Sequence, residues 1–319
     1  PLACKDCSIM YKPSKPYKQK IVNEIKKTWR TPYVSVSFNT YPIIKKKFSY
    51  PEVDHTDGIG TKGFYHWQQG TLKAAVIDAL AMNLNDLALV RAIPYKLSNH
   101  ITVPVEDARI LRIVKVLTSE CRKRKIAIVG GENSFHDNAD GLDISMTVSG
   151  FVKKPMRNRF RVGDVLVGLK SSGLHSNGIT KVRKIFRKEY RKEFTVPTRI
   201  YFDNIIPLLN EHKIHGMMHI TGGAFTKLKD VLSRADAVIF QPKQLQPQKI
   251  FQEIYQKGVS SQEMYSTFNC GIGFVLSVDK KDAASIISKV RNAAVIGEVA
   301  SGAGLVKIQS AFNGKIVQF

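Results

Sequence analysis

The segment from residue 55 to residue 62 reads His-Thr-Asp-Gly-Ile-Gly-Thr-Lys and gathers residue types that bind phosphate and metal ions. Two glycines let the backbone approach a ligand closely or turn with positive φ. A threonine hydroxyl and a lysine can bind phosphate oxygens, and the Asp57 carboxylate can bind a divalent cation. The segment therefore predicts a nucleotide and metal site. A tight turn after a strand is the alternative, because Asp-Gly is common in such turns.

A helix predicted from Thr71 to Val90 carries three polar residues among apolar ones. Asp78, Asn85 and Asp86 are seven and eight residues apart, and these spacings return to nearly the same side of an α-helix. Polar groups that share one side of a mostly apolar helix should face either a ligand or solvent.

Two loops in the second half each lie between a predicted strand and a helix. Residues 171–178 read Ser-Ser-Gly-Leu-His-Ser-Asn-Gly and precede a predicted helix over 179–191, and residues 219–223 read His-Ile-Thr-Gly-Gly. The first turn of a helix has free backbone N–H groups and the positive end of the helix dipole. Each loop therefore predicts an anion site.

Length and composition indicate a globular protein of two domains. The chain has 319 residues, of which 43% are hydrophobic and 24% charged. No apolar run approaches the roughly 20 residues that span a bilayer, and the lysine-rich start lacks the apolar core of a signal peptide. We expect a cytoplasmic protein with no membrane partner.

The formal net charge of +23 is typical of proteins that bind nucleic acid. The charge is concentrated in residues 1–50, with eleven Lys/Arg and two acids, and in residues 153–193, with thirteen and three. Neither cluster has the interleaved aromatic residues of a single-strand binder or a groove-reading motif. We therefore favour a lysine-rich compositional bias, or attraction of small anionic substrates, over a nucleic-acid partner.

Helices and strands alternate in both halves, which predicts an α/β protein. Residues 1–152 form the first predicted domain and residues 153–319 the second, with linker character in the arginine-rich stretch from Lys153 to Arg161. The sheets could be mixed rather than doubly wound. Four predicted strands lie next to the candidate motifs along the chain: residues 126–129, 142–152, 164–169 and 272–278.

In this order the motifs resemble the aminoimidazole ribonucleotide synthetase family, the phosphoribosylformylglycinamidine cyclo-ligases of purine biosynthesis. The matching stretches are Thr-Asp-Gly-Ile-Gly-Thr-Lys (56–62), Asp78 with Asn85-Asp86, Gly-Gly-Glu (130–132), Gly-Asp-Val-Leu-Val-Gly-Leu-Lys-Ser-Ser-Gly-Leu-His-Ser-Asn-Gly (163–178), Pro-Thr-Arg-Ile-Tyr (197–201), His-Ile-Thr-Gly-Gly (219–223) and Thr-Phe-Asn-Cys-Gly-Ile-Gly (267–273). The last three favour this enzyme over related kinases, synthases and dehydratases.

The resemblance implies an α/β fold with mixed sheets, in which an N-terminal ATP-binding and dimerisation domain joins a second subunit in a barrel-like dimer core. A C-terminal α/β domain would close the active cleft. The implied enzyme uses ATP and Mg²⁺ to phosphorylate the formamide oxygen of formylglycinamidine ribonucleotide, after which an amidine nitrogen closes the imidazole ring. Positioning and electrostatics would carry most of this catalysis.

The resemblance also implies roles for residues of this sequence. The expected catalytic residues are Asp57, Lys62, Asp86 and His175, and the expected metal ligands are Asp57, Asp86 and Glu132. The expected nucleotide and phosphate contacts are Lys12, Gly58, Gly60, Thr61, Asn85, Ser171, Asn177, Thr221, Gly222 and Gly223.

Two departures from the family pattern concern ATP and metal binding. Residues 34–47 lack the glycine-rich loop that usually precedes the Asp-Gly motif, and the residues after Glu132 lack the usual second acid. They motivate an alternative hypothesis: a diverged member with a different substrate, or with a non-catalytic ATP-binding or assembly role.

Overall fold

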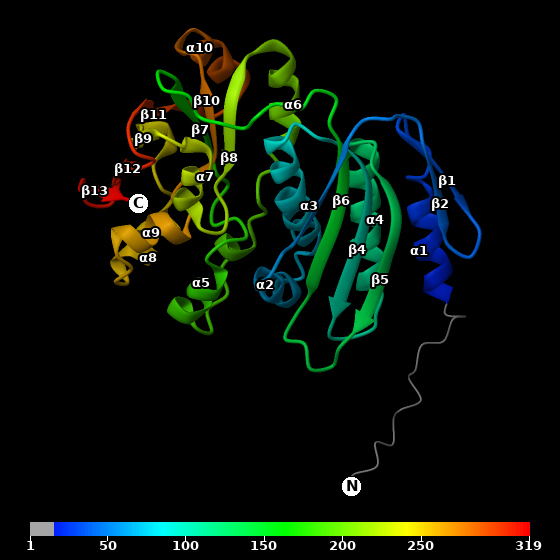
Figure 1. Cartoon of the computed structure of the whole chain (residues 1–319). Helices are drawn as coiled ribbons and strands as arrows, with labels where there is room; N and C mark the ends of the chain where they lie inside the picture. Colours follow the sequence, from blue (N-terminus) through cyan, green and yellow to red (C-terminus); the bar gives the residue numbers. More distant parts are fainter. Residues whose placement is uncertain (1–15) are drawn as a thin grey trace.

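The computed structural model describes residues 16–319, which form two large β-sheets and a small hairpin with helices packed around them (Figure 1). Lys12, one of the expected phosphate contacts, lies outside the described residues. No helix in the described part of the chain is long and apolar enough to cross a membrane.

The N-terminal half is built on a four-stranded sheet of order β3-β6-β4-β5. Its elements are α1 (Pro16–Lys26), β1 (Val34–Phe38), β2 (Pro42–Lys46), β3 (Glu52–Gly58), α2 (Lys62–Gln69), α3 (Leu72–Leu89), β4 (Ile93–Val103), α4 (Arg109–Lys123), β5 (Ala127–Phe135) and β6 (Asp143–Phe151). β4 and β5 are parallel, whereas β6 pairs antiparallel with both β3 and β4. The predicted α/β class with mixed sheets is confirmed.

The helix α3 lies between the two large sheets (Figure 1). It contacts β3 and β6 on one side and α6 and β8 of the C-terminal half on the other. Apolar residues such as Val76, Leu80 and Leu84 are fully buried, as expected of a helix that is covered on most sides. α3 confirms the helix predicted over 71–90 and brings its polar residues to the boundary between the halves.

The β1–β2 hairpin occupies the region where the family's glycine-rich loop is missing. β1 and β2 pair antiparallel, and Val34 packs with Tyr95 and Phe151 in a small apolar cluster. Lys46 forms an ion pair with Glu52. The sequence between α1 and β3 is therefore an ordered hairpin rather than a loop that wraps a phosphate.

The C-terminal half is built on a seven-stranded mixed sheet of order β13-β12-β9-β11-β7-β10-β8. Its elements are β7 (Val165–Lys170), α5 (Ile179–Phe186), η1 (Lys192–Thr195), α6 (Phe202–Glu211), β8 (Ile214–His219), η2 (Ala224–Leu228), α7 (Lys229–Leu232), β9 (Ala235–Ile239), η3 (Lys243–Leu245), α8 (Lys249–Gln256), α9 (Ser261–Thr267), β10 (Ile272–Val278), α10 (Lys280–Lys289), β11 (Ala293–Ser301), β12 (Val306–Gln309) and β13 (Ile316–Gln318). Every residue of β10 is buried, which explains why the strand is almost continuously apolar.

The helix predicted over 179–191 ends earlier than the sequence suggested. α5 stops at Phe186, and Arg187 takes a left-handed φ of 51°, a conformation that terminates a helix. The residues beyond it form a separate 3-10 turn, η1, in which Phe194 is fully buried.

Candidate active site

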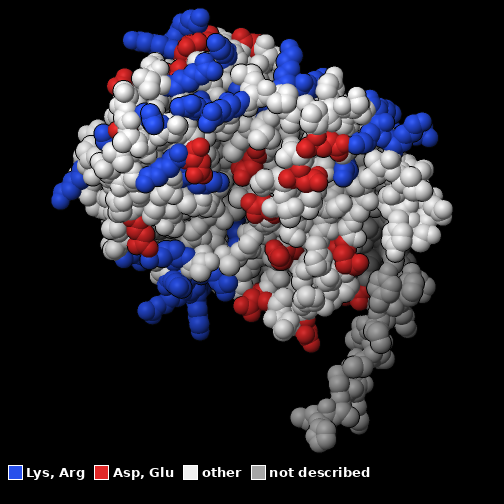
Figure 2. Space-filling view, in the orientation of Figure 1, with Lys and Arg blue, Asp and Glu red and all other residues white. Residues whose placement is uncertain are grey.

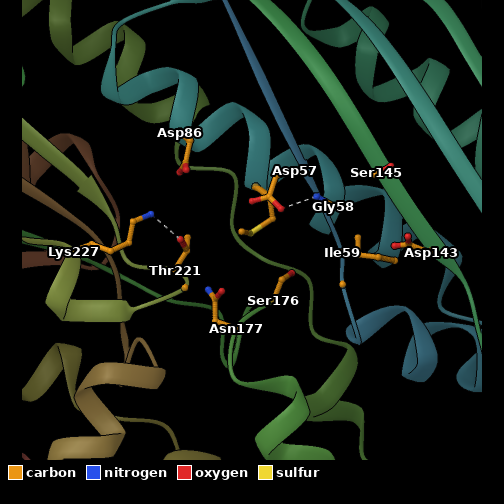
Figure 3. Close-up of a pocket in the computed structure, with 13 residues that line it drawn as sticks. Asp57, Gly58, Ile59, Asp86, Asp143, Ser145, Ser176, Asn177, Thr221 and Lys227 are labelled. Atoms are coloured by element: carbon orange, nitrogen blue, oxygen red, sulfur yellow. Dashed lines mark hydrogen bonds between the residues drawn. The ribbon is translucent and has the colours of Figure 1, made fainter. Parts of the chain in front are cut away.

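A cleft of about 570 Å³ lies between the two halves. Its lining residues are Asp57, Gly58, Ile59, Gly60, Met82, Asp86, Asp143, Ser145, Ser176, Asn177, Thr221, Gly222 and Lys227. Asp57 and Asp86 project from the N-terminal half toward the loops that carry Asn177, Thr221 and Lys227 (Figure 3). Residues from four of the predicted motifs therefore meet at one place.

The end of β3 forms one wall of the cleft. Asp57 accepts a hydrogen bond from the Gly58 N–H at 2.7 Å, and the Asp57 carbonyl accepts one from the Asn83 amide at 3.1 Å. A Cβ on Gly58 would lie 2.7 Å from the Ile144 carbonyl oxygen, so no larger residue fits there. Gly60 has a φ of +51°, which favours glycine. The two glycines are therefore required by the backbone that presents Asp57.

Asp86 is held by two histidines. Its Oδ1 lies 2.8 Å from His219 Nδ1, and its Oδ2 lies 3.4 Å from His55 Nε2. Burial acts to raise the pKa of Asp86, but the hydrogen bonds from His219 and His55 outweigh it, and the net pKa is lowered. The hydrogen bond to Asp86 raises the pKa of His55 in turn. Asp86 is therefore an anion at neutral pH.

Asn85 fixes the tautomer of His219. The Asn85 Oδ1 accepts hydrogen bonds from the N–H groups of Tyr201 and Phe202, at 2.7 and 3.2 Å, so its other terminus is the NH₂ group. That NH₂ lies 3.2 Å from His219 Nε2, which must therefore accept, leaving Nδ1–H to donate to Asp86. Asn85, expected to contact nucleotide, does not line the cleft. It contacts His219, which in turn bonds to Asp86 in the cleft lining.

The C-terminal half supplies donors for an anion. Lys227 Nζ donates to Thr221 Oγ1 at 3.3 Å, and both residues line the cleft. The Asn177 Nδ2 is buried and has no hydrogen-bond partner among residues 16–319, although it lies on the same surface. A buried amide donor is costly to leave unpaired, so this group fits an absent acceptor such as a phosphate oxygen.

Lys62 does not reach the cleft, which corrects the expectation that it contacts phosphate. Its side chain is fully buried, and Nζ donates to Asp78 at 2.9 Å and to the Val196 carbonyl at 2.6 Å. Asp78 also accepts hydrogen bonds from His66, Ser176 and Thr198. A lysine that opens a helix after a glycine turn looks the same in the sequence whether it points outward or inward.

Glu132 is also separated from the two aspartates, so the predicted set of three metal ligands does not converge within one chain. β3 and β5 are the opposite edges of the sheet, and Asp57 aligns across it with Met146, Asn99 and Gly131. Three strand spacings place Glu132 roughly 14 Å from Asp57. Glu132 is exposed and accepts a hydrogen bond from the Asn133 N–H at 3.0 Å.

Four further expected contacts lie beside the cleft rather than in its lining. His175 is fully buried with a φ of 61°, its Nε2 accepts from the Ser172 N–H at 3.1 Å, and burial lowers its pKa. Ser171 is buried against Gln248, Thr61 is exposed and bonds to Thr180, and Gly223 supplies a left-handed turn before η2. These residues shape the loops that carry Ser176, Asn177 and Thr221.

The sequence analysis missed Lys227, Asp143 and Ser145. Lys227 follows Thr221 by six residues, and the tight η2 turn returns its side chain to the loop. Asp143 and Ser145 alternate with the buried Ile144 and Met146 on β6, a period-two pattern that places both on the exposed face of the sheet. Burial raises the pKa of Asp143. The spacing of Lys227 from Thr221 and the alternation of polar and apolar residues over 143–146 are both visible in the sequence.

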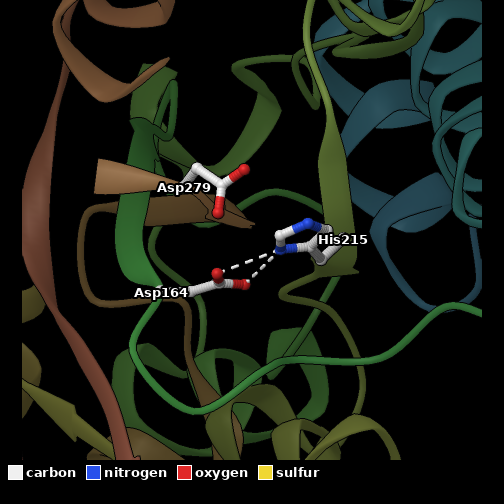
Figure 4. A group of neighbouring side chains, drawn as sticks. All are labelled: Asp164, His215 and Asp279. Atoms are coloured by element: carbon white, nitrogen blue, oxygen red, sulfur yellow. Dashed lines mark hydrogen bonds and ion pairs between the residues drawn. The ribbon is translucent and has the colours of Figure 1, made fainter. Parts of the chain in front are cut away.

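A second group of potential metal ligands lies in the C-terminal half, at the ends of β7, β8 and β10 (Figure 4). Within the described residues, Asp164, His215 and Asp279 are the three side chains whose ligand atoms lie within 4.8 Å of one another. Asp164 already accepts hydrogen bonds from His215 at 2.8 Å and from Ser277 at 2.5 Å. Its buried charge is therefore compensated by the protein, and we assign the group to strand anchoring.

Comparisons with known proteins agree with this arrangement. Residues 50–152 match the N-terminal domain of AIR synthase related proteins, and residues 161–308 match the C-terminal domain. The phosphoribosylformylglycinamidine cyclo-ligase of Saccharolobus solfataricus is 36% identical over 264 residues, which cover 79% of this chain and 80% of that one. The enzyme of the same name from Thermococcus kodakarensis is 34% identical over 269 residues, covering 78% and 79%.

Solved structures share the fold at lower sequence identity. The hydrogenase maturation protein HypE in complex with ATP has a TM-score of 0.68 at 17% identity and covers 95% of this chain and 94% of its own. Thiamine-monophosphate kinase from Stenotrophomonas maltophilia has a TM-score of 0.64 at 15% identity and covers 92% and 95%.

Proposed function

The chain belongs to the family of AIR synthase related proteins, and on that premise we propose that it is a phosphoribosylformylglycinamidine cyclo-ligase of purine biosynthesis. The substrates are ATP and formylglycinamidine ribonucleotide, and the products are aminoimidazole ribonucleotide, ADP and phosphate. The diverged-member alternative is not favoured, because the relatives that share about a third of the sequence carry the cyclo-ligase name. This biosynthetic role suits the cytoplasm.

The observation that carries the proposal is the pairing of two carboxylates with anion donors across one cleft. Asp57 and Asp86 face Lys227, Thr221 and Asn177. Phosphoryl transfer needs groups that fix phosphate oxygens and balance their charge, and little covalent participation by the protein. An unpartnered buried donor at Asn177 and a lysine beside Thr221 provide such groups.

In the proposed reaction the formamide oxygen attacks the terminal phosphorus of ATP, so a new P–O bond forms and the bond to ADP breaks. An amidine nitrogen then attacks the activated carbon, a C–N bond forms, and phosphate leaves with the former formamide oxygen as one proton is released. Lys227 and Asn177 hold phosphate oxygens during both steps. Gly58 and Gly60 let the backbone approach the substrate closely.

Asp57 and Asp86 are the residues that would hold Mg²⁺. The ion prefers oxygen ligands and is usually bound by one or two carboxylates together with substrate phosphates, which matches the carboxylates that face the anion donors. When bound, it supplies positive charge that balances the phosphates. The lowered pKa of Asp86 keeps its carboxylate in the ionised form that such binding requires, with burial opposed by the bonds from His219 and His55.

We also propose that residues 1–152 form the ATP-binding and dimerisation domain and residues 153–319 the domain that closes the cleft. Apolar side chains on and near the β1–β2 hairpin support a homodimer, since Phe38, Tyr41 and Ile43 are 53%, 77% and 58% exposed. Light scattering at micromolar concentration is expected to give twice the chain mass. A single-chain mass across the concentration range would contradict the dimer.

The direct test of the proposed function is turnover by the purified protein. With ATP, Mg²⁺ and formylglycinamidine ribonucleotide, we expect equal amounts of ADP and aminoimidazole ribonucleotide, the latter measured by a colorimetric amine assay. A reaction without the ribonucleotide should form ADP far more slowly. Folded protein that binds ATP but yields no aminoimidazole ribonucleotide would refute the cyclo-ligase assignment.

A further inference from the structure

The arginine-rich segment between the two large sheets is packed against the C-terminal half and is not a free linker. Along residues 157–161, arginines alternate with Asn158 and Phe160. Asn158 accepts a hydrogen bond from the Met217 N–H at 2.7 Å and donates to the Met217 carbonyl at 2.8 Å, and Phe160 is 1% exposed. Backbone bonds from Arg159 N–H to His215 and from Phe160 N–H to Val231 fix the segment against the C-terminal half. Arg157 and Arg161 are exposed and Arg159 is partly exposed, so these arginines lie on the outer side of the segment.

These outward arginines share one pocket. Arg157, Arg159 and Arg161 line a cavity of about 340 Å³ together with Arg234, which approaches from the turn before β9. The remaining lining residues are Phe160, Val162 and Ala235, so no acidic side chain of the described residues contributes to the wall. Four arginines thus line one concave surface together with three apolar residues.

None of the four guanidinium groups is neutralised by a described part of the chain. The other ordered arginines include Arg124 and Arg191, each of which forms ion pairs with two carboxylates. No ion pair or side-chain hydrogen bond joins Arg157, Arg159, Arg161 or Arg234 to another residue in the range 16–319. Clustered like charges repel one another, and a concave surface concentrates their potential.

This pocket is separate from the active cleft. The Arg159 N–H bonds to His215 near the start of β8, whereas His219 at the other end of β8 bonds to Asp86. Four residues of extended strand separate these points by roughly 13 Å. Figure 2 shows one face of the molecule, on which basic side chains are widespread and several acidic side chains lie across the middle. Attraction of substrate into the cleft therefore does not account for these arginines.

We propose that the four-arginine pocket is a second anion site that binds a small molecule with two adjacent phosphate groups. Guanidinium forks bind phosphate oxygens in a bidentate manner, and four of them match the oxygens of a diphosphate better than those of one phosphate. The cavity volume is that of a small ligand site. Phe160, the aromatic residue among the described lining residues, is 1% exposed and offers no ring face on which a nucleic-acid base could stack.

The test is calorimetric titration of the full chain with inorganic pyrophosphate in magnesium-free buffer. The double change Arg159→Gln with Arg234→Gln is expected to raise the Kd at least about tenfold, and binding to the unmodified protein should weaken steeply as salt is added. The matched control is Arg122→Gln, which removes one exposed arginine from α4, and its Kd should stay within about twofold.

Three outcomes would overturn the proposal. The first is an unchanged Kd in the double variant, verified as folded by its thermal midpoint. The second is binding of single-stranded RNA without binding of pyrophosphate. The third is equal affinity for pyrophosphate and orthophosphate, because that would show a general charge effect rather than a site for two phosphate groups. Cyclo-ligase turnover is measured separately and does not decide among these results.

Discussion

Replacing Asp86 by Asn is expected to reduce cyclo-ligase turnover by at least about 1,000-fold, or about 4 kcal/mol of transition-state stabilisation. The amide introduced at this position would keep an oxygen that can accept the His219 Nδ1–H bond, so the hydrogen-bond chain through Asn85 survives. What is lost is the negative charge. A neutral amide is a poor ligand for Mg²⁺ and cannot balance a cation beside the ATP phosphates.

The experiment compares kcat and KM for ATP in Asp86→Asn, in the unmodified protein and in Asp137→Asn. Asp137 is an exposed aspartate of the β5–β6 connection and lines no part of the cleft, so its change should alter kcat less than about twofold. Thermal midpoints verify that all three proteins are folded. If Asp86→Asn kept kcat within a few fold of the unmodified protein, Asp86 would be a residue that only positions His219.

The sequence predicted the cleft through residues that are adjacent along the chain. Asp57, Gly58 and Gly60 lie in one turn, and Thr221 with Gly222 in another, and all five line the cleft. The fold class followed from the same kind of information, because the apolar runs of β7 and β10 and the periodicity of α3 are local patterns. The motif order then supplied the family.

The errors arose where side-chain direction or strand order decides the outcome. Lys62 points into the protein because α2 packs against α3, and that packing depends on residues 16 positions away. Glu132 is placed by the order β3-β6-β4-β5, which puts the ends of β3 and β5 at opposite edges of the sheet. Neither fact is encoded within a single short motif. Lys227 was missed because its role depends on the tightness of one turn.

The buried pair of Lys62 and Asp78 leads to the second large expected effect. Asp78→Asn should lower the free energy of unfolding by about 3–5 kcal/mol, because Lys62 would remain fully buried without a counter-charge. Adding Lys62→Met removes that charge, and the double variant should recover most of the loss, since neutral replacements of buried ion pairs are often tolerated. In a chain of this length the single change corresponds to a thermal midpoint about 4–8 °C lower.

The pH dependence gives a second measurement of the same pair. Burial acts to raise the pKa of Asp78, but the charge of Lys62 and the hydrogen bond from His66 outweigh it, and the net pKa is lowered. A carboxyl group with a depressed folded-state pKa stabilises the protein above its unfolded pKa, about 3.9, and the contribution is lost as pH falls through the folded value. The difference in midpoint between the unmodified protein and Asp78→Asn should therefore be constant from pH 7 to about pH 5 and narrow below about pH 4.

The double variant also separates the two roles that Lys62 could have. Asp78 accepts hydrogen bonds from Ser176 and Thr198, so it joins α3 to the loops of the C-terminal half, and Ser176 lines the cleft. If Lys62 is only the internal partner of Asp78, the double variant should keep KM for ATP within about threefold at about 20 °C, well below its midpoint. A KM for ATP raised about tenfold or more in a stable double variant would indicate that Lys62 contacts an ATP phosphate. Its buried ion pair with Asp78 would then have to open when ATP binds.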